Sequence, residues 1–219
     1  MSDKRTYGDS CGIARALDRV GERWALLVVR ELTLGPKRFT DLRDGLPGIG
    51  PDVLAQRLRD LDAAGVIRRR KLPPPAPARV YELTEWGAEL EPVLIALGRW
   101  GSRTGLPDPP PALSPDALAL ALETTYAPAI TPAAACYQII LGEHAFTVTV
   151  GAFGIGLTRG EATDPAFVLR TDTNTLAALL WHGLSVEAAA AADAIALEGD
   201  PAGLVQFLDY FPGPVPVAV

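Results

Sequence analysis

The sequence predicts an α+β fold in two parts: helices with one two-stranded hairpin come first, and a five-stranded sheet with helices follows. Leucines recur at helical spacing up to residue 61, whereas short strand-like runs separated by glycine-rich turns follow residue 135. Between these parts, residues 105–115 contain five prolines. Because proline cannot continue a helix or donate within a sheet, we expect a linker at 105–114 between domains 1–104 and 115–219.

The composition is that of a globular protein. Of the 219 residues, 48% are hydrophobic and 21% are charged, which excludes a wholly disordered, collagen-like or coiled-coil chain. No apolar run approaches the roughly 20 residues of a membrane span, and the polar start has no apolar signal core. We therefore expect a cytoplasmic protein. Cys11 and Cys136 are too few for a disulfide framework and too far apart for a metal motif.

The charge is divided unevenly between the two parts. Residues 1–104 contain 18 Lys and Arg against 14 Asp and Glu, a net of +4, whereas residues 105–219 contain 2 against 12, a net of −10. This division is typical of a protein in which one domain meets nucleic acid and the other would repel it. A drift in composition between domains is the alternative.

The first domain begins with helical patterns. The spacing of apolar residues predicts two helices within 11–34, and Thr40 is placed to cap a short helix that runs to Leu46. After a turn at 47–50, Pro51 starts a further helix that Gly65 ends. Residues 66–72 and 79–83 then form a hairpin across a PPPAPA loop.

A helix, a tight turn, a second helix and a hairpin together indicate a winged helix-turn-helix. Such a domain places its second helix in the major groove of DNA and its wing along the backbone. On the second helix the leucines face the core, so polar side chains face outward, and Gln and Arg are the types that match base edges. The alternative is that these side chains only solvate the helix. The predicted DNA-binding residues are Thr40, Pro51, Asp52, Gln56, Arg57, Arg59, Arg69 and Arg79.

A last helix of this domain starts at Thr84, and Pro92 predicts a kink in it. Its apolar face, from Trp86 to Trp100, is wider than one small domain needs. We expect a homodimer that shares this surface, with ordinary core packing as the alternative.

The second domain mixes strands and helices. We expect helices to start at Ser114, Asp172, Ser185 and Asp200, and strands at 136–141, 145–150, 153–158, 166–170 and 194–198.

Four blocks of the first domain resemble the HxlR family of winged-helix bacterial transcriptional regulators. The blocks read CGIARALDRVGERW (11–24), RELTLGPKRFTDLR (30–43), IGPDVLAQRLRDL (49–61) and LTEWG (83–87), and the resemblance covers about residues 10–103. It implies a homodimer in which the first and last helices of the domain pack across the twofold axis. It also implies DNA contact, on a palindromic operator, through the helix that carries Gln56 and Arg57. Gly50 departs from the family's usual serine, which puts one phosphate contact in doubt.

Residues 115–211 are similar to the sterol-carrier-protein-like fold, on the runs LRTDTNTLAALLWHGLSVEAA and IALEGDPAGLVQFL. Members of that fold often enclose an apolar tunnel, so the resemblance implies a site for an apolar small-molecule effector. Core packing is the alternative for the same residues. The candidate lining residues are Phe146, Phe153, Phe167, Leu180, Trp181, Phe207 and Phe211.

Signatures of an enzyme, a metal site or a bound cofactor are missing. His144 and His182 stand in neither a metal-ligand spacing nor a nucleophile motif. Cys11, at a helix start near Arg15, is a candidate redox sensor, as some HxlR-like regulators use a cysteine near this position; a half-buried structural cysteine is the alternative. We thus expect a DNA-binding regulator, with an apolar carrier protein that uses its winged helix for dimerisation as the alternative.

Overall fold

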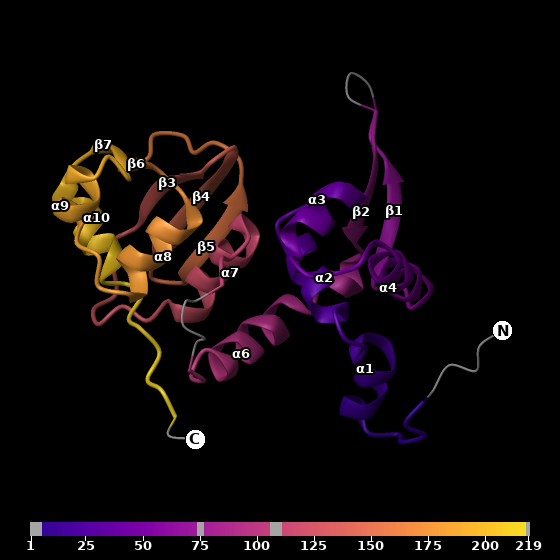
Figure 1. Cartoon of the computed structure of the whole chain (residues 1–219). Coiled ribbons are helices and arrows are strands. Elements are labelled where there is room, and N and C mark those ends of the chain that lie inside the picture. Colours follow the sequence, from indigo (N-terminus) through magenta and orange to yellow (C-terminus); the bar gives the residue numbers. More distant parts are fainter. Residues whose placement is uncertain (1–5, 74–76, 106–110, 218–219) are drawn as a thin grey trace. The chain divides into compact units, whose positions relative to one another are not determined.

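The computed structural model describes residues 6–73, 77–105 and 111–217 (Figure 1). The chain divides into two compact units, Met1–Leu94 and Ile95–Val219. Helix α6 (Glu91–Gly101) begins in the first unit and ends in the second. Half of the expected linker, residues 106–110, lies outside the described residues, and its role as a domain boundary stays a prediction.

The first unit opens with the helices that the apolar spacing predicts. Leu54, Leu58 and Leu61 are at most 1% exposed, which confirms that this stripe faces the core. Pro51 is the first residue of its helix and Gly50 is the N-cap, as expected from the fixed φ of proline. The helices are α1 (Gly12–Val20), α2 (Ala25–Thr33), α3 (Phe39–Gly45) and α4 (Pro51–Ala63).

Helix α3 begins earlier than the sequence predicts. Arg38 is its N-cap, and the backbone N–H of Arg38 donates to Asp41 Oδ2 at 2.9 Å. The prediction that Thr40 caps this helix is wrong, because the carboxylate of Asp41 reaches back and closes the first turn two residues earlier. Thr40 instead lies inside the helix, exposed, and its Oγ1 donates to Asp41 Oδ1 at 3.2 Å.

The predicted wing is present. Strands β1 (Ile67–Lys71) and β2 (Arg79–Leu83) pair antiparallel, with Arg69 opposite Tyr81. The loop before α3 joins this hairpin at one edge, since the N–H and carbonyl of Lys37 both bond to Tyr81, at 3.0 and 2.8 Å. Residues 74–76 of the expected PPPAPA loop lie outside the described residues.

The helical segment after the wing is divided rather than continuous. The hydroxyl of Thr84 accepts from the N–H of Gly87 at 2.9 Å and so caps α5 (Glu85–Ala88). Helix α6 then starts at Glu91, next to Pro92. The predicted kink is therefore a full break, because the proline ring would clash with the carbonyl four residues earlier. A side chain at Gly87 would collide with the carbonyl of Val66, which explains this glycine.

The second unit contains a five-stranded mixed sheet with the strand order β5-β4-β3-β6-β7. β3 and β6 run parallel, and the other neighbouring strands run antiparallel. The expected helix starts at Ser114, Asp172, Ser185 and Asp200 are all confirmed as N-caps whose side chains accept a backbone N–H. The elements are α7 (Pro115–Thr125), β3 (Ala135–Leu141), β4 (His144–Gly151), β5 (Gly154–Arg159), β6 (Phe167–Thr171), α8 (Thr173–Trp181), α9 (Val186–Ala191), β7 (Ala196–Gly199) and α10 (Pro201–Leu208).

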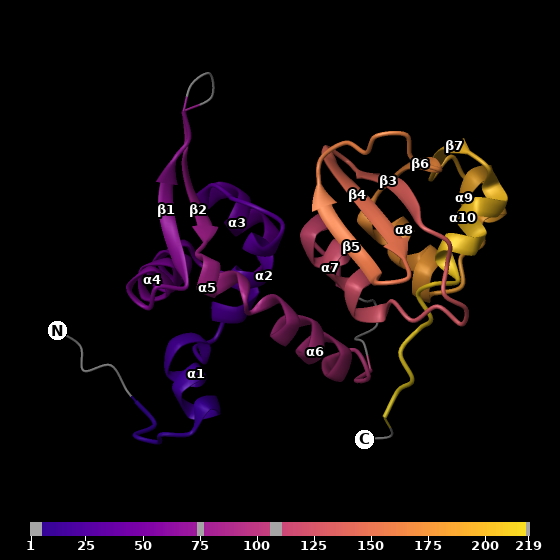
Figure 2. The ribbon, with the colours of Figure 1, turned by 180° about the vertical axis from the view of Figure 1, so that it is seen from behind.

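The core of the second unit lies on one face of this sheet. Figure 1 shows α8 in front of the strands, and Figure 2 shows the strands in front of α8. Where α10 packs against the sheet the core is aromatic, and neighbouring ring centroids lie as close as 4.8 Å. Burial and a hydrogen bond with Tyr210 raise the pKa of Tyr137 to about 12. The cluster consists of Tyr126, Tyr137, Phe167, Phe207, Tyr210 and Phe211.

Within the described ranges, every helix is too short or too polar to cross a bilayer.

Candidate nucleic-acid interface

The outward face of α4 carries polar side chains that the sequence predicts for DNA contact. Pro51 and Asp52 are exposed in its first turn, and Gln56 and Arg59 are exposed in the turns that follow. The structure brings the last two together: Arg59 Nη2 donates to Gln56 Oε1 at 2.6 Å. This face therefore offers both the amide and the guanidinium groups that match base edges.

Arg57 does not face outward as predicted. Its side chain is only 14% exposed, and its Nη1 lies 3.2 Å from Asp60 Oδ2 and 3.6 Å from Glu22 Oε2. Its Nε is buried without a hydrogen-bond partner among the described residues. The prediction of an outward Arg57 is wrong because this position lies at the edge of the leucine stripe, where the carboxylates of Asp60 and Glu22 hold the side chain against the unit.

Most wing arginines are paired with acidic groups. Arg68 and Arg70, two residues apart on β1, both reach Glu82, through Nε at 2.7 and 2.8 Å. Arg69 projects to the other side, where its Nε lies 3.6 Å from Asp62 and its guanidinium lies over the ring of Tyr81.

The far end of the wing carries two further cations. Arg79 and Lys71 lie opposite each other in the hairpin and are both exposed. Among the described residues neither forms an ion pair, so they are available to meet phosphate. Arg69 and Arg79 are thus both exposed but differ in their contacts: Arg69 lies beside Asp62 and Tyr81 with its side chain 56% exposed, whereas Arg79 forms no ion pair among the described residues.

A buried ion cluster, which sequence reasoning missed, fixes α2 and the wing. The Glu31 side chain is 0% exposed, its Oε1 accepts from Arg30 Nη2 at 2.8 Å, and its Oε2 accepts from Lys37 Nζ at 2.6 Å. Since the backbone of Lys37 also pairs with Tyr81, this cluster connects α2 to β2. The available signal was an acidic residue next to Arg30 inside a helix that is otherwise mostly apolar.

Comparisons with known proteins address the first unit. The family model for HxlR-like helix-turn-helix proteins matches residues 19–108. A regulator described as uncharacterized HTH-type transcriptional regulator sll1512, from Synechocystis, is 41% identical over 95 residues, which span 43% of this chain and 70% of that protein. The chain belongs to the HxlR-like helix-turn-helix family. It is thus a transcriptional regulator of a typically non-enzymatic type, whose fold implies DNA binding.

A second regulator matches a similar share of the chain. The regulator YodB of Bacillus subtilis is 33% identical over 88 residues, which span 40% of this chain and 79% of YodB. The solved structure of its reduced form covers 43% of this chain and 94% of that one, at 31% identity and a TM-score of 0.39. The family model ends at residue 108, so these comparisons do not identify the second unit.

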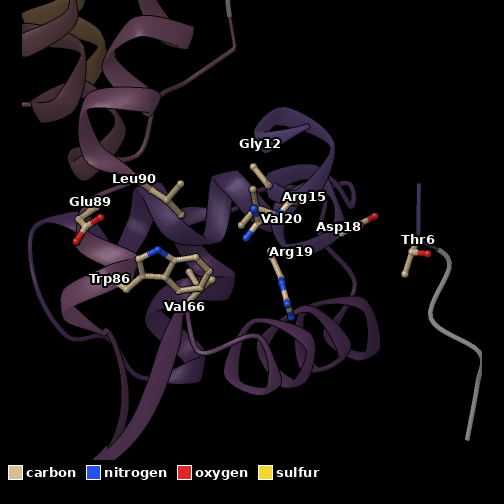
Figure 3. Close-up of a pocket in the computed structure, with 11 residues that line it drawn as sticks. Thr6, Gly12, Arg15, Asp18, Arg19, Val20, Val66, Trp86, Glu89 and Leu90 are labelled. Carbon is tan, nitrogen blue, oxygen red and sulfur yellow. The ribbon is translucent and has the colours of Figure 1, made fainter. Parts of the chain in front are cut away.

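Helix α1 of this HxlR-family chain borders a pocket of about 610 Å³ (Figure 3). Arg15 and Arg19 of α1 line it, and Val66, Trp86 and Leu90 lie on its other side. The apolar residues of α1 remain partly uncovered, since Ile13 is 73% exposed. Trp86 is also exposed, so the pocket belongs to a larger apolar surface of the first unit.

Cys11 is the N-cap residue of α1 and is exposed. Its carbonyl accepts from the N–H of Arg15 at 3.0 Å, so the thiol lies at the first turn of the helix. The structure thus places it where the sequence predicts.

The candidate effector residues of the second unit are only partly brought together. Phe167, Phe207 and Phe211 belong to the aromatic cluster. Phe146 lies apart from them and, together with residues of α7, lines a space of about 10 Å³. Leu180 is buried and Trp181 half-buried, at the end of α8. The prediction that Phe153 lines a cavity is wrong, because it is fully exposed between β4 and β5, where the hairpin turns away from the core.

Proposed function

We propose that the chain is a homodimeric, sequence-specific regulator that places α4 in the major groove of a palindromic operator. The observation that carries this proposal is the exposed Gln56–Arg59 pair on the second helix of a helix-turn-helix whose wing ends in Arg79 and Lys71. In this geometry the helix reads base edges and the wing contacts the backbone.

The two contact types are separable by experiment. Replacing Arg59 with alanine removes a base-edge donor and should cost about 1–3 kcal/mol on the preferred duplex while changing random-sequence affinity little. Replacing Arg79 with alanine should weaken binding to all duplexes alike and reduce the salt slope by about one unit. Anisotropy titrations at several salt concentrations measure both effects.

A matched control is Arg170→Ala, which removes an arginine of the second unit with a side chain that is 53% exposed. It should leave both quantities unchanged. Equal affinity of wild type and Arg59→Ala on the preferred duplex, and on every variant of it, contradicts base reading by this face of α4.

The homodimer rests on apolar side chains that one copy leaves uncovered. Ile13 and Leu17 follow one another on α1, and Val93, Leu97 and Trp100 follow one another on α6, all between 41% and 73% exposed. A second copy that covers these helices removes that surface from water. Two recognition helices related by a twofold axis then fit two half-sites.

Sedimentation velocity tests the dimer. Trp100→Glu should shift the chain to monomer at micromolar concentration, because it places a charge within the apolar face. Phe153→Glu is the control, since Phe153 is even more exposed than Trp100 but lies in a hairpin turn of the second unit. A wild-type monomer at all concentrations refutes the homodimer.

Redox control through Cys11 is a separate proposal. An exposed thiol at the first turn of a helix is accessible to oxidants and electrophiles. Cys11→Ser should bind DNA normally in reducing buffer and keep that binding after peroxide treatment that releases the wild type. If peroxide releases both proteins equally, the sensor is elsewhere.

The second unit is proposed to bind an apolar effector in a sterol-carrier-like core. Two buried polar atoms, Tyr126 Oη and Trp181 Nε1, have no hydrogen-bond partner among the described residues, which is uncommon for buried groups. The small space beside Phe146 and α7 measures only about 10 Å³ and does not include these two residues, so entry of an effector requires side chains of the core to separate.

Dodecanoate is a suitable probe for this effector site. It should raise the unfolding temperature of the full chain by mass action, less so in Tyr126→Phe, and it should alter operator affinity. A carrier protein would bind the probe while DNA affinity stays unchanged. Absence of any thermal shift rejects both ideas.

A further inference from the structure

Side chains of the recognition helix form a continuous set of contacts around Asp60. Gln56 Nε2 donates to Asp60 Oδ1 at 2.8 Å, and Arg57 Nη1 lies 3.2 Å from Asp60 Oδ2. Arg57 in turn reaches Glu22, in the turn between α1 and α2, and Arg59 donates to the oxygen of Gln56. One carboxylate thus joins an exposed amide to a side chain that is held against the body of the unit.

These contacts fix the amide of Gln56 from both ends. Asp60 takes one of the two N–H groups of Nε2, and Arg59 occupies one lone pair of Oε1. One N–H and one lone pair of the amide stay unused. A donor and an adjacent acceptor are what a glutamine presents to the N7 and N6 positions of adenine. The amide is therefore oriented before DNA arrives, which lowers the rotamer entropy lost on binding.

The position of Asp60 argues against a merely solvating role. A carboxylate near DNA repels phosphate, so an acidic side chain on this helix costs general affinity. The Asp60 side chain is only 33% exposed and spends both oxygens on neighbours of the same helix. Arg57, whose side chain is 14% exposed, pairs with Asp60 and so keeps the Asp60 carboxylate in its position on the helix.

We propose that Asp60 is the positioning residue that sets base specificity at the position read by Gln56. The proposal rests on the proposed DNA-binding function of α4. Asp60 makes no base contact of its own. It holds the glutamine amide in the orientation that forms two hydrogen bonds with adenine, and this orientation disfavours the other bases. The expected readout is a change in base preference, not a uniform loss of affinity.

Asp62 provides a matched control on the same helix. Its side chain is 39% exposed, close to the 33% of Asp60, and it pairs with wing residue Arg69 at 3.6 Å instead of with Gln56. Asp60→Ala and Asp62→Ala remove the same charge at neighbouring helical positions, and alanine favours the helix in both. Both variants gain general DNA affinity from the lost carboxylate, so only their difference reports the contact with Gln56.

The experiment selects binding sites from a random duplex library with the full chain. The wild-type motif then gives single-base-pair variants for titration with Asp60→Ala, Asp62→Ala, Gln56→Ala and the double variant Gln56→Ala/Asp60→Ala. Asp60→Ala should lose roughly five- to tenfold of the discrimination at the one base pair per half-site that Gln56→Ala also loses. Asp62→Ala should keep this discrimination, and once Gln56 is absent Asp60→Ala should cause no further change in discrimination at that base pair.

Three results for discrimination at this base pair would overturn the proposal. They are no loss of discrimination in Asp60→Ala, an equal loss in Asp60→Ala and Asp62→Ala, and a loss in the double variant that is the sum of the two single losses. Circular dichroism and random-duplex affinity verify that each variant is folded, and Asp60→Ser repeats the test if the alanine variant is not. A wild-type chain that enriches no motif refutes the proposed function itself, which distinguishes that failure from the failure of Asp60 alone.

Discussion

Replacing Glu31 with glutamine should destabilise the first unit more than any exposed charge change. The wild-type carboxylate is completely buried and faces Arg30 and Lys37, whose side chains are 22% and 11% exposed. Glutamine offers one acceptor oxygen and turns an NH₂ group toward one of the two cations. Removing one partner of a buried ion pair costs about 3–5 kcal/mol, because the remaining charge is buried without compensation.

That loss is large compared with the stability of a domain. The free energy of unfolding of a domain is about 5–15 kcal/mol, so a loss of about 4 kcal/mol leaves the fold only marginally stable. For a unit of this size, each kcal/mol lowers the melting temperature by about 4–8 °C, so we expect a decrease of about 15–30 °C. The wing should loosen as well, since Lys37 also pairs with Tyr81 through its backbone.

Urea unfolding of the full chain, followed by circular dichroism, measures the change. Asp44→Asn is the control in the same unit: the pair Arg43–Asp44 is 50% and 73% exposed at 3.6 Å, and such pairs contribute less than about 1 kcal/mol. Glu31→Leu combined with Lys37→Met should recover much of the loss, since it removes the two more deeply buried charges and leaves only Arg30, whose side chain is 22% exposed. A loss below about 1 kcal/mol for Glu31→Gln would refute this account of the buried cluster.

Three further predictions concern the second unit. Because the folded pKa of Tyr137 is raised to about 12, above the ordinary value near 10, the unfolded chain ionises first; stability should be full below about pH 10 and fall as pH rises toward 12, and less so in Tyr137→Phe, as alkaline melting curves will show. Burial acts to raise the pKa of Asp172, but hydrogen bonds from Thr175 and Asn174 outweigh it and lower that pKa. Asp172→Ala should therefore cost about 1 kcal/mol at neutral pH, and its difference from wild type should shrink as pH falls through the range below about 4, measured by urea titration. Phe207→Ala should cost about 3–5 kcal/mol, whereas Phe153→Ala, at a fully exposed side chain, should stay within about 0.5 kcal/mol; equal effects in calorimetry would contradict the placement of these two rings.

The local chemistry of the sequence determined where most elements begin and end. The caps at Thr84, Ser114 and Asp172 and the proline at position 51 act within one turn of chain, so their effect is visible without a tertiary structure. The same applies to the order of strands and helices in the second unit and to the outward direction of Gln56. The regulatory function was predicted from the family blocks within residues 10–103, and the comparisons confirm it for that part of the chain.

Other features depended on which groups meet in space. The start of α3 was misplaced because Asp41 competes with Thr40 for the role of closing the turn. Arg57 has the spacing of a surface residue, but Glu22 comes from another element, and only the tertiary structure brings the two together. Phe153 and Phe207 are the same residue type in apolar surroundings, yet one lies at a hairpin turn and the other under the sheet. Sequence patterns report the direction of a side chain along its own helix or strand, whereas burial and ion pairing depend on the neighbours that the fold supplies.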